Sequence, residues 1–146
     1  MCISPDEVRN LDDHLLRPDD VILMCRGPRN YAVPVGSEVP ARTIVAGSFH
    51  VMRPDTSRVH PAFLAWLLNQ EEAQTFLHAN NSGTTIPMIA LEVLRALPLR
   101  LPPIAVQQRV TELNGLIEHE HNLMNQLTTT RRALLRGWAN LQFIHA

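Results

Sequence analysis

The spacing of hydrophobic and polar positions changes several times along the chain, and each change predicts a different element. Residues 21–25 (VILMC) form a continuous apolar run between Pro18-Asp19-Asp20 and Gly27-Pro28, which predicts a buried strand between two turns. Further short strands are expected at residues 31–35, 43–46 and 48–52. Together these segments predict a small, twisted, mixed β-sheet.

From Pro61 onward the apolar spacing becomes helical. Phe63, Leu64, Leu67 and Leu68 are followed by Phe76 and Leu77, which predicts one helix that begins at Pro61. The polar turn residues 80–83 (NNSG) would end this helix. A short helix at residues 91–95 is then expected to lead into a strand at residues 97–101 (LPLRL), just before Pro102-Pro103.

The stretch that follows, residues 104–141, contains no proline and predicts one long helix. About 38 residues at about 1.5 Å each would span about 57 Å. A domain of about 100 residues has a radius of gyration near 13 Å, so the helix would extend beyond it. We therefore expect an α+β fold with a small domain at residues 1–102 and a long C-terminal coiled-coil helix within residues 103–146.

A heptad frame describes this helix. Eight of its ten seam positions are apolar, and the exceptions are Glu120 and Arg131. The seam consists of Val110, Ile117, Met124, Arg131 and Trp138 at a, and of Leu113, Glu120, Leu127, Leu134 and Leu141 at d.

The two charged seam positions favour an antiparallel partner. In a parallel homodimer Glu120 would meet Glu120, and Arg131 would meet Arg131. In an antiparallel pair centred between Met124 and Leu127, Glu120 of one helix lies beside Arg131 of the other. The alternative is a monomer whose helix folds back on its own domain or breaks near a glycine. Leu116, Leu123 and Leu135 widen the apolar stripe, which suggests packing against more than one neighbour.

Composition narrows the class of protein. Apolar residues make up 45% and charged residues 18%, as in ordinary globular proteins. No window of about 18 consecutive apolar residues is present, so a membrane span is not expected. Residues 1–10 lack the basic and apolar regions of a secretory signal, and a cytoplasmic location is expected.

Metal, cofactor and catalytic chemistry are not expected. Cys2 and Cys25 are the only cysteines, and the seven histidines lack ligand spacing. The chain has no glycine-rich phosphate loop, no dinucleotide fingerprint and no nucleophile with an evident base. Neither catalytic residues nor metal ligands are therefore nominated.

The net charge of -1 by itself argues against strong nonspecific nucleic-acid binding. The middle of the chain is nevertheless locally basic, because residues 21–70 contain five arginines against Glu38 and Asp55. The turn after residues 21–25 presents Arg26, Arg29, Asn30 and Tyr31, and arginine and asparagine can read base edges or contact phosphates. A solvated hairpin turn is the alternative.

A second candidate segment, residues 80–85, includes Thr84 and Thr85. Its polar side chains and flexible backbone could contact DNA, and a helix-capping loop is the alternative.

Three segments resemble the DNA-specificity subunits of type I restriction-modification systems. Residues 16–23 (LRPDDVIL) are similar to the family's L-x-P-G-D-[IV]-[IL] strand entry, with an aspartate where the family has glycine. Residues 61–68 resemble its P-x-[FY]-L-x-x-x-L helix. Residues 82–110 resemble the junction where a target recognition domain enters a conserved spacer helix, and LPLRLPPIAVQQRV is the most specific part. In this chain only about 15 residues precede the first motif, whereas the family has a much longer segment there.

The resemblance implies one target recognition domain at residues 1–102 and one spacer helix at residues 103–146. Family members bind DNA without cutting or methylating it, and they recruit methyltransferase and restriction subunits. A complete member has two recognition domains and two antiparallel helices, so one domain and one helix imply an antiparallel homodimer of half-subunits. The alternative is a truncated relative that no longer binds DNA and acts as an assembly or regulatory partner.

Overall fold

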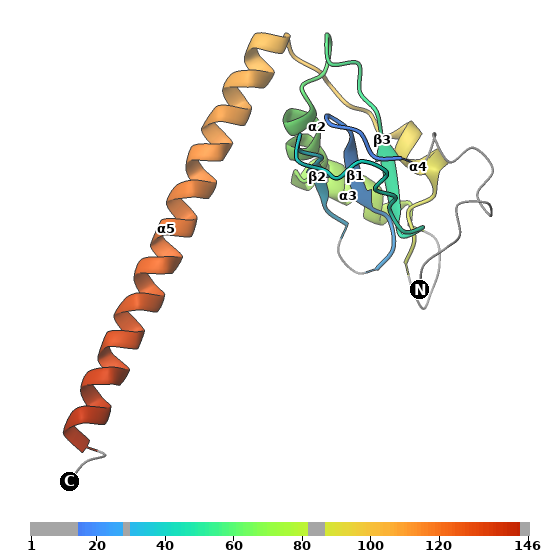
Figure 1. The fold of residues 1–146 in the computed structure, drawn as a ribbon. Coiled ribbons are helices and arrows are strands. Elements are labelled where there is room, and N and C mark those ends of the chain that lie inside the picture. Colours follow the sequence, from blue (N-terminus) through green and yellow to red (C-terminus); the bar gives the residue numbers. More distant parts are fainter. Residues whose placement is uncertain (1–14, 28–29, 82–86, 144–146) are drawn as a thin grey trace. The chain divides into compact units, whose positions relative to one another are not determined.

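A computed structural model describes residues 15–27, 30–81 and 87–143, and the side chain of Leu141 is also outside the description. Met1–Gln108 and Arg109–Ala146 form two compact units, each of which is considered by itself. The described elements are β1 (Val21–Met24), β2 (Ala32–Pro34), β3 (Phe49–Met52), α2 (Pro61–Leu68), α3 (Glu71–Ala79), α4 (Leu91–Ala96) and α5 (Ile104–Phe143) (Figure 1). The predicted α+β class is confirmed.

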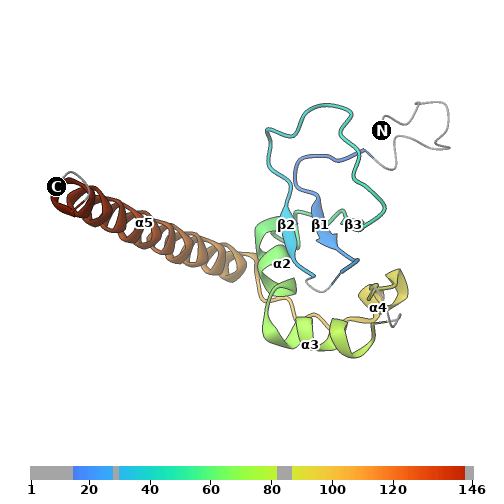
Figure 2. The same cartoon turned by 90° about the horizontal axis from the view of Figure 1, so that it is seen from below.

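The sheet has three strands in the order β2-β1-β3, and both pairings are antiparallel. The sheet is therefore antiparallel, not mixed as the sequence suggested. Ile22 lies opposite Val33 on one side and Val51 on the other, which fixes the register. The continuous apolar run occupies the central strand, where both edges are paired (Figure 2).

Two helices replace the single helix predicted from Pro61. Pro61 begins α2, where its missing N–H costs nothing, and α2 ends at Leu68. Asn69 caps it, and the extended backbone of Gln70 (ψ 154°) separates it from α3. The Asn69 side chain donates from Nδ2 to the Ala32 carbonyl and accepts from the Ala32 N–H through Oδ1, both at 2.8 Å. The residue that caps α2 is thus hydrogen-bonded to β2.

Two predicted strands are absent from the described ladder. Residues 43–46 contribute only an isolated bridge between Ile44 and Leu15. Residues 97–101 are assigned to no strand, although their alternation is partly kept because Leu97 is buried and Leu101 is 44% exposed. The alternating apolar residues therefore belong to a half-buried segment that does not pair with a strand.

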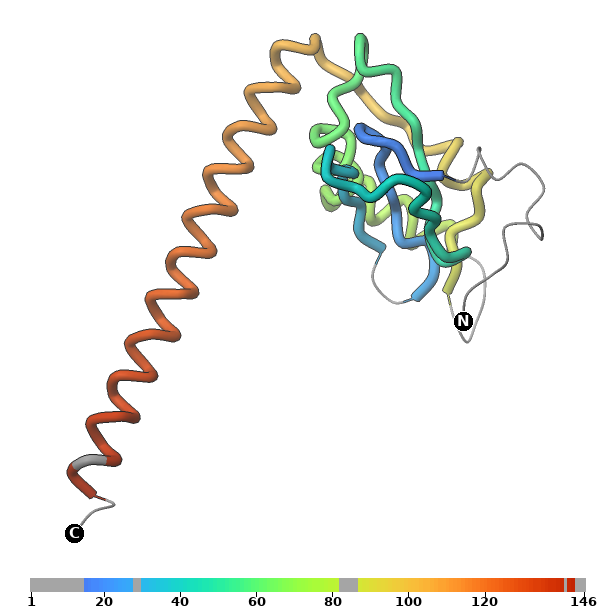
Figure 3. The backbone as a smooth tube through the Cα atoms, viewed as in Figure 1, coloured from blue at the N-terminus to red at the C-terminus, as the bar shows by residue number. Residues whose placement is uncertain are grey.

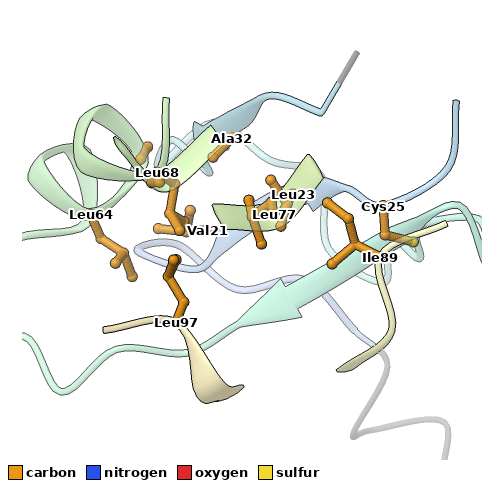
Figure 4. Packing of buried hydrophobic residues seen from close by; sticks show 11 residues of the cluster. Val21, Leu23, Cys25, Ala32, Leu64, Leu68, Leu77, Ile89 and Leu97 are labelled. Carbon is orange, nitrogen blue, oxygen red and sulfur yellow. The ribbon is translucent and has the colours of Figure 1, made fainter. Parts of the chain in front are cut away.

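The core lies between the sheet and the helices α2 and α3. Its buried residues are Val21, Leu23, Cys25, Ala32, Leu64, Ala65, Leu68, Ala73, Leu77, Ile89 and Leu97 (Figure 4). Val21 and Leu23 are fully buried, whereas Ile22 and Met24 between them are only partly buried, as expected for alternating faces of a strand.

A buried acid stabilises the entry to β1. Asp20 is 1% exposed and accepts hydrogen bonds from Arg53 Nε at 2.8 Å, Arg53 Nη2 at 3.0 Å and the Arg17 N–H at 2.8 Å. Asp19 beside it has φ of 69°, a left-handed conformation that favours glycine. Asp19, which matches the glycine of the Pro-Gly-Asp motif, thus has a backbone conformation that glycine adopts more easily.

The long helix expected from residue 104 is confirmed as α5, which has 40 residues (Figure 3). Its first turn belongs to the N-terminal unit and contributes the fully buried Gln107. Gln107 accepts from the His60 N–H at 2.9 Å and donates to the carbonyls of Arg58 at 3.0 Å and Pro102 at 2.8 Å. None of the described helices combines the length and apolarity needed to cross a membrane.

Candidate nucleic-acid interface

The turn after β1 lies beside residues 87–89. Arg26 pairs with Met88 in an isolated antiparallel bridge, and the Gly27 N–H donates to the Pro87 carbonyl at 3.0 Å. The Ile89 N–H donates to the Cys25 carbonyl at 2.8 Å. Residues 87–89 therefore run alongside residues 25–27. Arg29, Thr84 and Thr85 lie outside the described residues.

Arg26 and Tyr31 are exposed on this turn. Arg26 places Nη2 3.6 Å from the Met88 sulfur, and the Tyr31 side chain is 47% exposed. The Met24 N–H donates to the Tyr31 carbonyl at 3.0 Å, which continues the β1–β2 ladder to Tyr31. A guanidinium and an aromatic ring are thus available at one end of the sheet, and both can contact nucleic acid.

Asn30 lies differently from these two residues. Asn30 is only 4% exposed, and its side-chain Nδ2 donates a hydrogen bond to the Met24 carbonyl at 2.9 Å. Its Oδ1 is buried without a hydrogen-bond partner. In this conformation the amide supports the end of β1 and is not presented at the surface.

Cys25, the described cysteine, lies beneath this turn. Burial raises the pKa of its thiol, with smaller opposing contributions from a backbone hydrogen bond and the charge of Arg26. A thiol with a raised pKa is a poor nucleophile at neutral pH. Within the described ranges, no three His, Cys, Asp or Glu side chains gather as metal ligands would.

At the other end of β1, the charge of Asp20 is paired with that of Arg53. Burial acts to raise the pKa of Asp20, but the hydrogen bonds from Arg53 and the Arg17 N–H, together with both positive charges, outweigh it. The pKa of Asp20 is therefore below its ordinary value. The buried carboxylate is held ionised by Arg53 and would not repel a phosphate as an unpaired acid would.

A groove that sequence reasoning missed lies between α3 and residues 97–100. It has a volume of about 470 Å³ and an apolar lining with Glu72 and Arg100 among its polar residues. The residues of this lining are Leu67, Gln70, Glu72, Ala73, Phe76, Leu97, Pro98, Leu99 and Arg100. The alternating leucines that predicted a strand supply one wall of it.

Most of the described seam positions of α5 are exposed to solvent. Val110 is partly buried, and Glu120 and Arg131 are exposed. The exposed apolar seam residues are Leu113 (60%), Ile117 (54%), Met124 (59%), Leu127 (45%), Leu134 (69%) and Trp138 (57%). So large an exposed apolar stripe on a helix is typical of a surface that binds another helix.

Comparison with known proteins supports the fold. No protein-family model and no curated protein matches the chain. Among solved structures, the chain is similar to the HsdS subunit from Thermoanaerobacter tengcongensis, with a TM-score of 0.63 and 21% identity. The match covers 82% of this chain and 31% of that chain, so this chain spans less than a third of the HsdS subunit. The fold is thus like that of a type I restriction-modification specificity subunit.

Proposed function

We propose that this chain is a non-catalytic, DNA-binding specificity half-subunit of a type I restriction-modification system. Residues 1–102 would recognise DNA, and residues 103–146 would form an antiparallel homodimer and dock methyltransferase and restriction subunits. The observation that supports this best is the combination of an HsdS-like fold with an exposed apolar seam on a 40-residue helix. A helix of this kind has little to stabilise its seam without a partner.

DNA would bind at the turn after β1. Arg26 and Tyr31 are exposed there, the return segment at Met88 lies beside them, and Arg29, Thr84 and Thr85 belong to the adjoining segments. Asn30 would contribute indirectly, because its amide is bound to the Met24 carbonyl.

A DNA mobility-shift titration at several salt concentrations tests this assignment. The affinity of the wild type should fall steeply with salt, because each neutralised phosphate contributes about -0.9 to the logarithmic slope. Arg26→Ala should reduce the magnitude of that slope by about 1. Arg58→Ala, which removes an exposed arginine outside the turn, is the matched control. An equal effect of both substitutions would contradict a site at this turn.

The charges of α5 support the antiparallel pair. Its first half contains Glu112, Glu118 and Glu120, and its second half contains Arg131, Arg132 and Arg136. Antiparallel pairing places each acidic half beside a basic half, whereas parallel pairing places like charges together.

A charge-swap series measured by sedimentation tests the pair. Glu120→Arg and Arg131→Glu should each weaken dimerisation by about 3-fold to 10-fold, since exposed like-charge contacts cost about 1 kcal/mol. The double variant should recover most of the loss. If it is no better than the single variants, the pairing of these residues is wrong.

A truncated relative that has lost DNA binding is the second candidate. It is favoured by the buried amide of Asn30, which removes one polar side chain from the presented surface. Such a protein would dimerise, or pair with full-length subunits, and would show no DNA affinity at low salt. The salt titration therefore separates the two proposals.

A further inference from the structure

The antiparallel pair proposed above would leave its two flanks unequal. The flanks are the helix rows on either side of the seam, at heptad positions g and e. Row g contains Arg109, Leu116, Leu123, Thr130 and Gly137, and row e contains Asn114, His121, Thr128, Leu135 and Gln142. The two-fold axis of an antiparallel pair puts both g rows on one side and both e rows on the other.

The g side of the pair would be apolar over its centre, with one charged residue, Arg109, towards each end. Leu116 is 68% exposed and Leu123 is 50% exposed, and each occurs twice on this side of the pair. Their row neighbours Thr130 and Gly137 are small. From Leu116 to Gly137 no side chain in the g rows carries a charge, and Arg109 lies two turns before Leu116. The e side instead alternates an amide, an imidazole and a hydroxyl before its one leucine.

Large and small residues alternate across the g side. In the proposed register Gly137 of the second helix is level with Asn114 of the first, and Thr130 of the second is level with His121 of the first. Each leucine of one helix is therefore close in height to a small residue of the other. A Cβ added at Gly137 would meet nothing within 4 Å, so the space beside it is open.

This arrangement is self-complementary. If a second pair is rotated by half a turn about an axis along the helices, its Leu116 lies opposite Gly137 and its Leu123 opposite Thr130. Leucines then enter the spaces left by small residues, as ridges enter grooves between packed helices. Closed dihedral symmetry follows, which is common among soluble tetramers.

We propose that the g flank of α5 binds a second copy of the antiparallel pair, so that the chain by itself forms a dimer of dimers. This proposal rests on the proposed antiparallel pair. The occupant is a second copy because the flank complements itself in size at Leu116 against Gly137 and is continuous with the seam. The interface contains few side chains, so the tetramer should dissociate to dimers on dilution.

Sedimentation of the full chain over a wide concentration range tests the proposal. The wild type should pass from dimer to tetramer as concentration rises. Leu116→Gln with Leu123→Gln should raise the tetramer dissociation constant by about 100-fold or more and leave the dimer intact, because eight leucines leave the interface. Glutamine is a good helix former, so circular dichroism should show unchanged helix content.

Two further variants make the test specific. Leu135→Gln is the matched control, because Leu135 is 66% exposed but lies on the e flank, and it should leave the tetramer unchanged. Gly137→Leu should fill the space that receives Leu116 and abolish the tetramer while it strengthens the helix. Gly137→Leu removes no apolar surface, so loss of the tetramer in this variant would show that the fit of the two surfaces matters and not hydrophobicity alone.

The possible outcomes test the antiparallel pair and the tetramer separately. A wild type that is monomeric at every concentration overturns both the antiparallel pair and the tetramer. A wild type that stays dimeric at every concentration overturns only the tetramer. A tetramer that Leu135→Gln weakens as strongly as the double variant overturns the assignment to the g flank.

Discussion

Replacing Arg53 with alanine tests how much of the domain's stability depends on its ion pair with Asp20. Asp20 is 1% exposed, and two of its three hydrogen bonds come from Arg53. Loss of one partner of a buried pair costs about 3–5 kcal/mol. Because the Arg53 side chain is 40% exposed, solvent screens part of the interaction. We therefore expect Arg53→Ala to lower the free energy of unfolding by about 2–3 kcal/mol.

Urea unfolding at neutral pH measures this loss. Fluorescence of Trp66, on α2, follows the domain if Trp138 on α5 is first replaced by phenylalanine in every variant. A loss of about 2 kcal/mol would lower the urea midpoint by about 1 M at a slope of about 2 kcal/mol/M. Asp20→Asn should cost less than Arg53→Ala, because no unpaired charge remains in the interior.

The pH dependence gives an independent check. Since the pKa of Asp20 is lower in the folded state, its ionised form stabilises the fold above the ordinary carboxyl value of about 4. This contribution is lost as pH falls through the lowered folded pKa. The stability difference between wild type and Asp20→Asn should therefore shrink below about pH 4. A cost for Arg53→Ala under about 0.5 kcal/mol, or a difference that does not change on acidification, would refute the reasoning.

Two further substitutions probe positions where local structure is unusual. Asp19→Val should destabilise by about 1–2 kcal/mol because its φ of 69° is unfavourable for a branched side chain, whereas Asp19→Gly should stay within about 0.5 kcal/mol of wild type in the same assay. Gln107→Ala should cost about 2–4 kcal/mol because three part-buried backbone groups lose their side-chain partner, while Gln108→Ala, at the exposed neighbour, should cost under about 0.5 kcal/mol. Equal costs for the two glutamine variants would contradict the role given to Gln107.

The spacing of apolar residues predicted those elements whose limits depend on their own sequence. The run at residues 21–25 predicted β1, and the proline-free stretch from residue 104 predicted α5 within a few residues of its observed end. The end of α2 did not follow, because no proline or glycine marks it. Asn69 ends the helix while bonding to Ala32, a contact between residues 37 positions apart that spacing cannot reveal.

The nominated site stays a prediction, and the structure adds detail only for its described residues. Arg26 is exposed and pairs with Met88, a residue that the sequence did not nominate. Residue type suggested that Asn30 would be presented with Arg26, yet its amide donates a hydrogen bond to the Met24 carbonyl and is buried. Met88 itself had no sequence signal, because a methionine after a turn is ordinary until its bridge partner is known.

Asn69 has a consequence for the behaviour of the protein in a crowded solution. Its amide offers Ala32 one donor and one acceptor, as the backbone of a neighbouring strand would, so one side chain completes the outer edge of β2. The strand then ends at Pro34, which has no N–H to offer. An edge closed in this way gives an approaching chain little backbone to pair with, so protection against strand-mediated aggregation is built into the end of a helix.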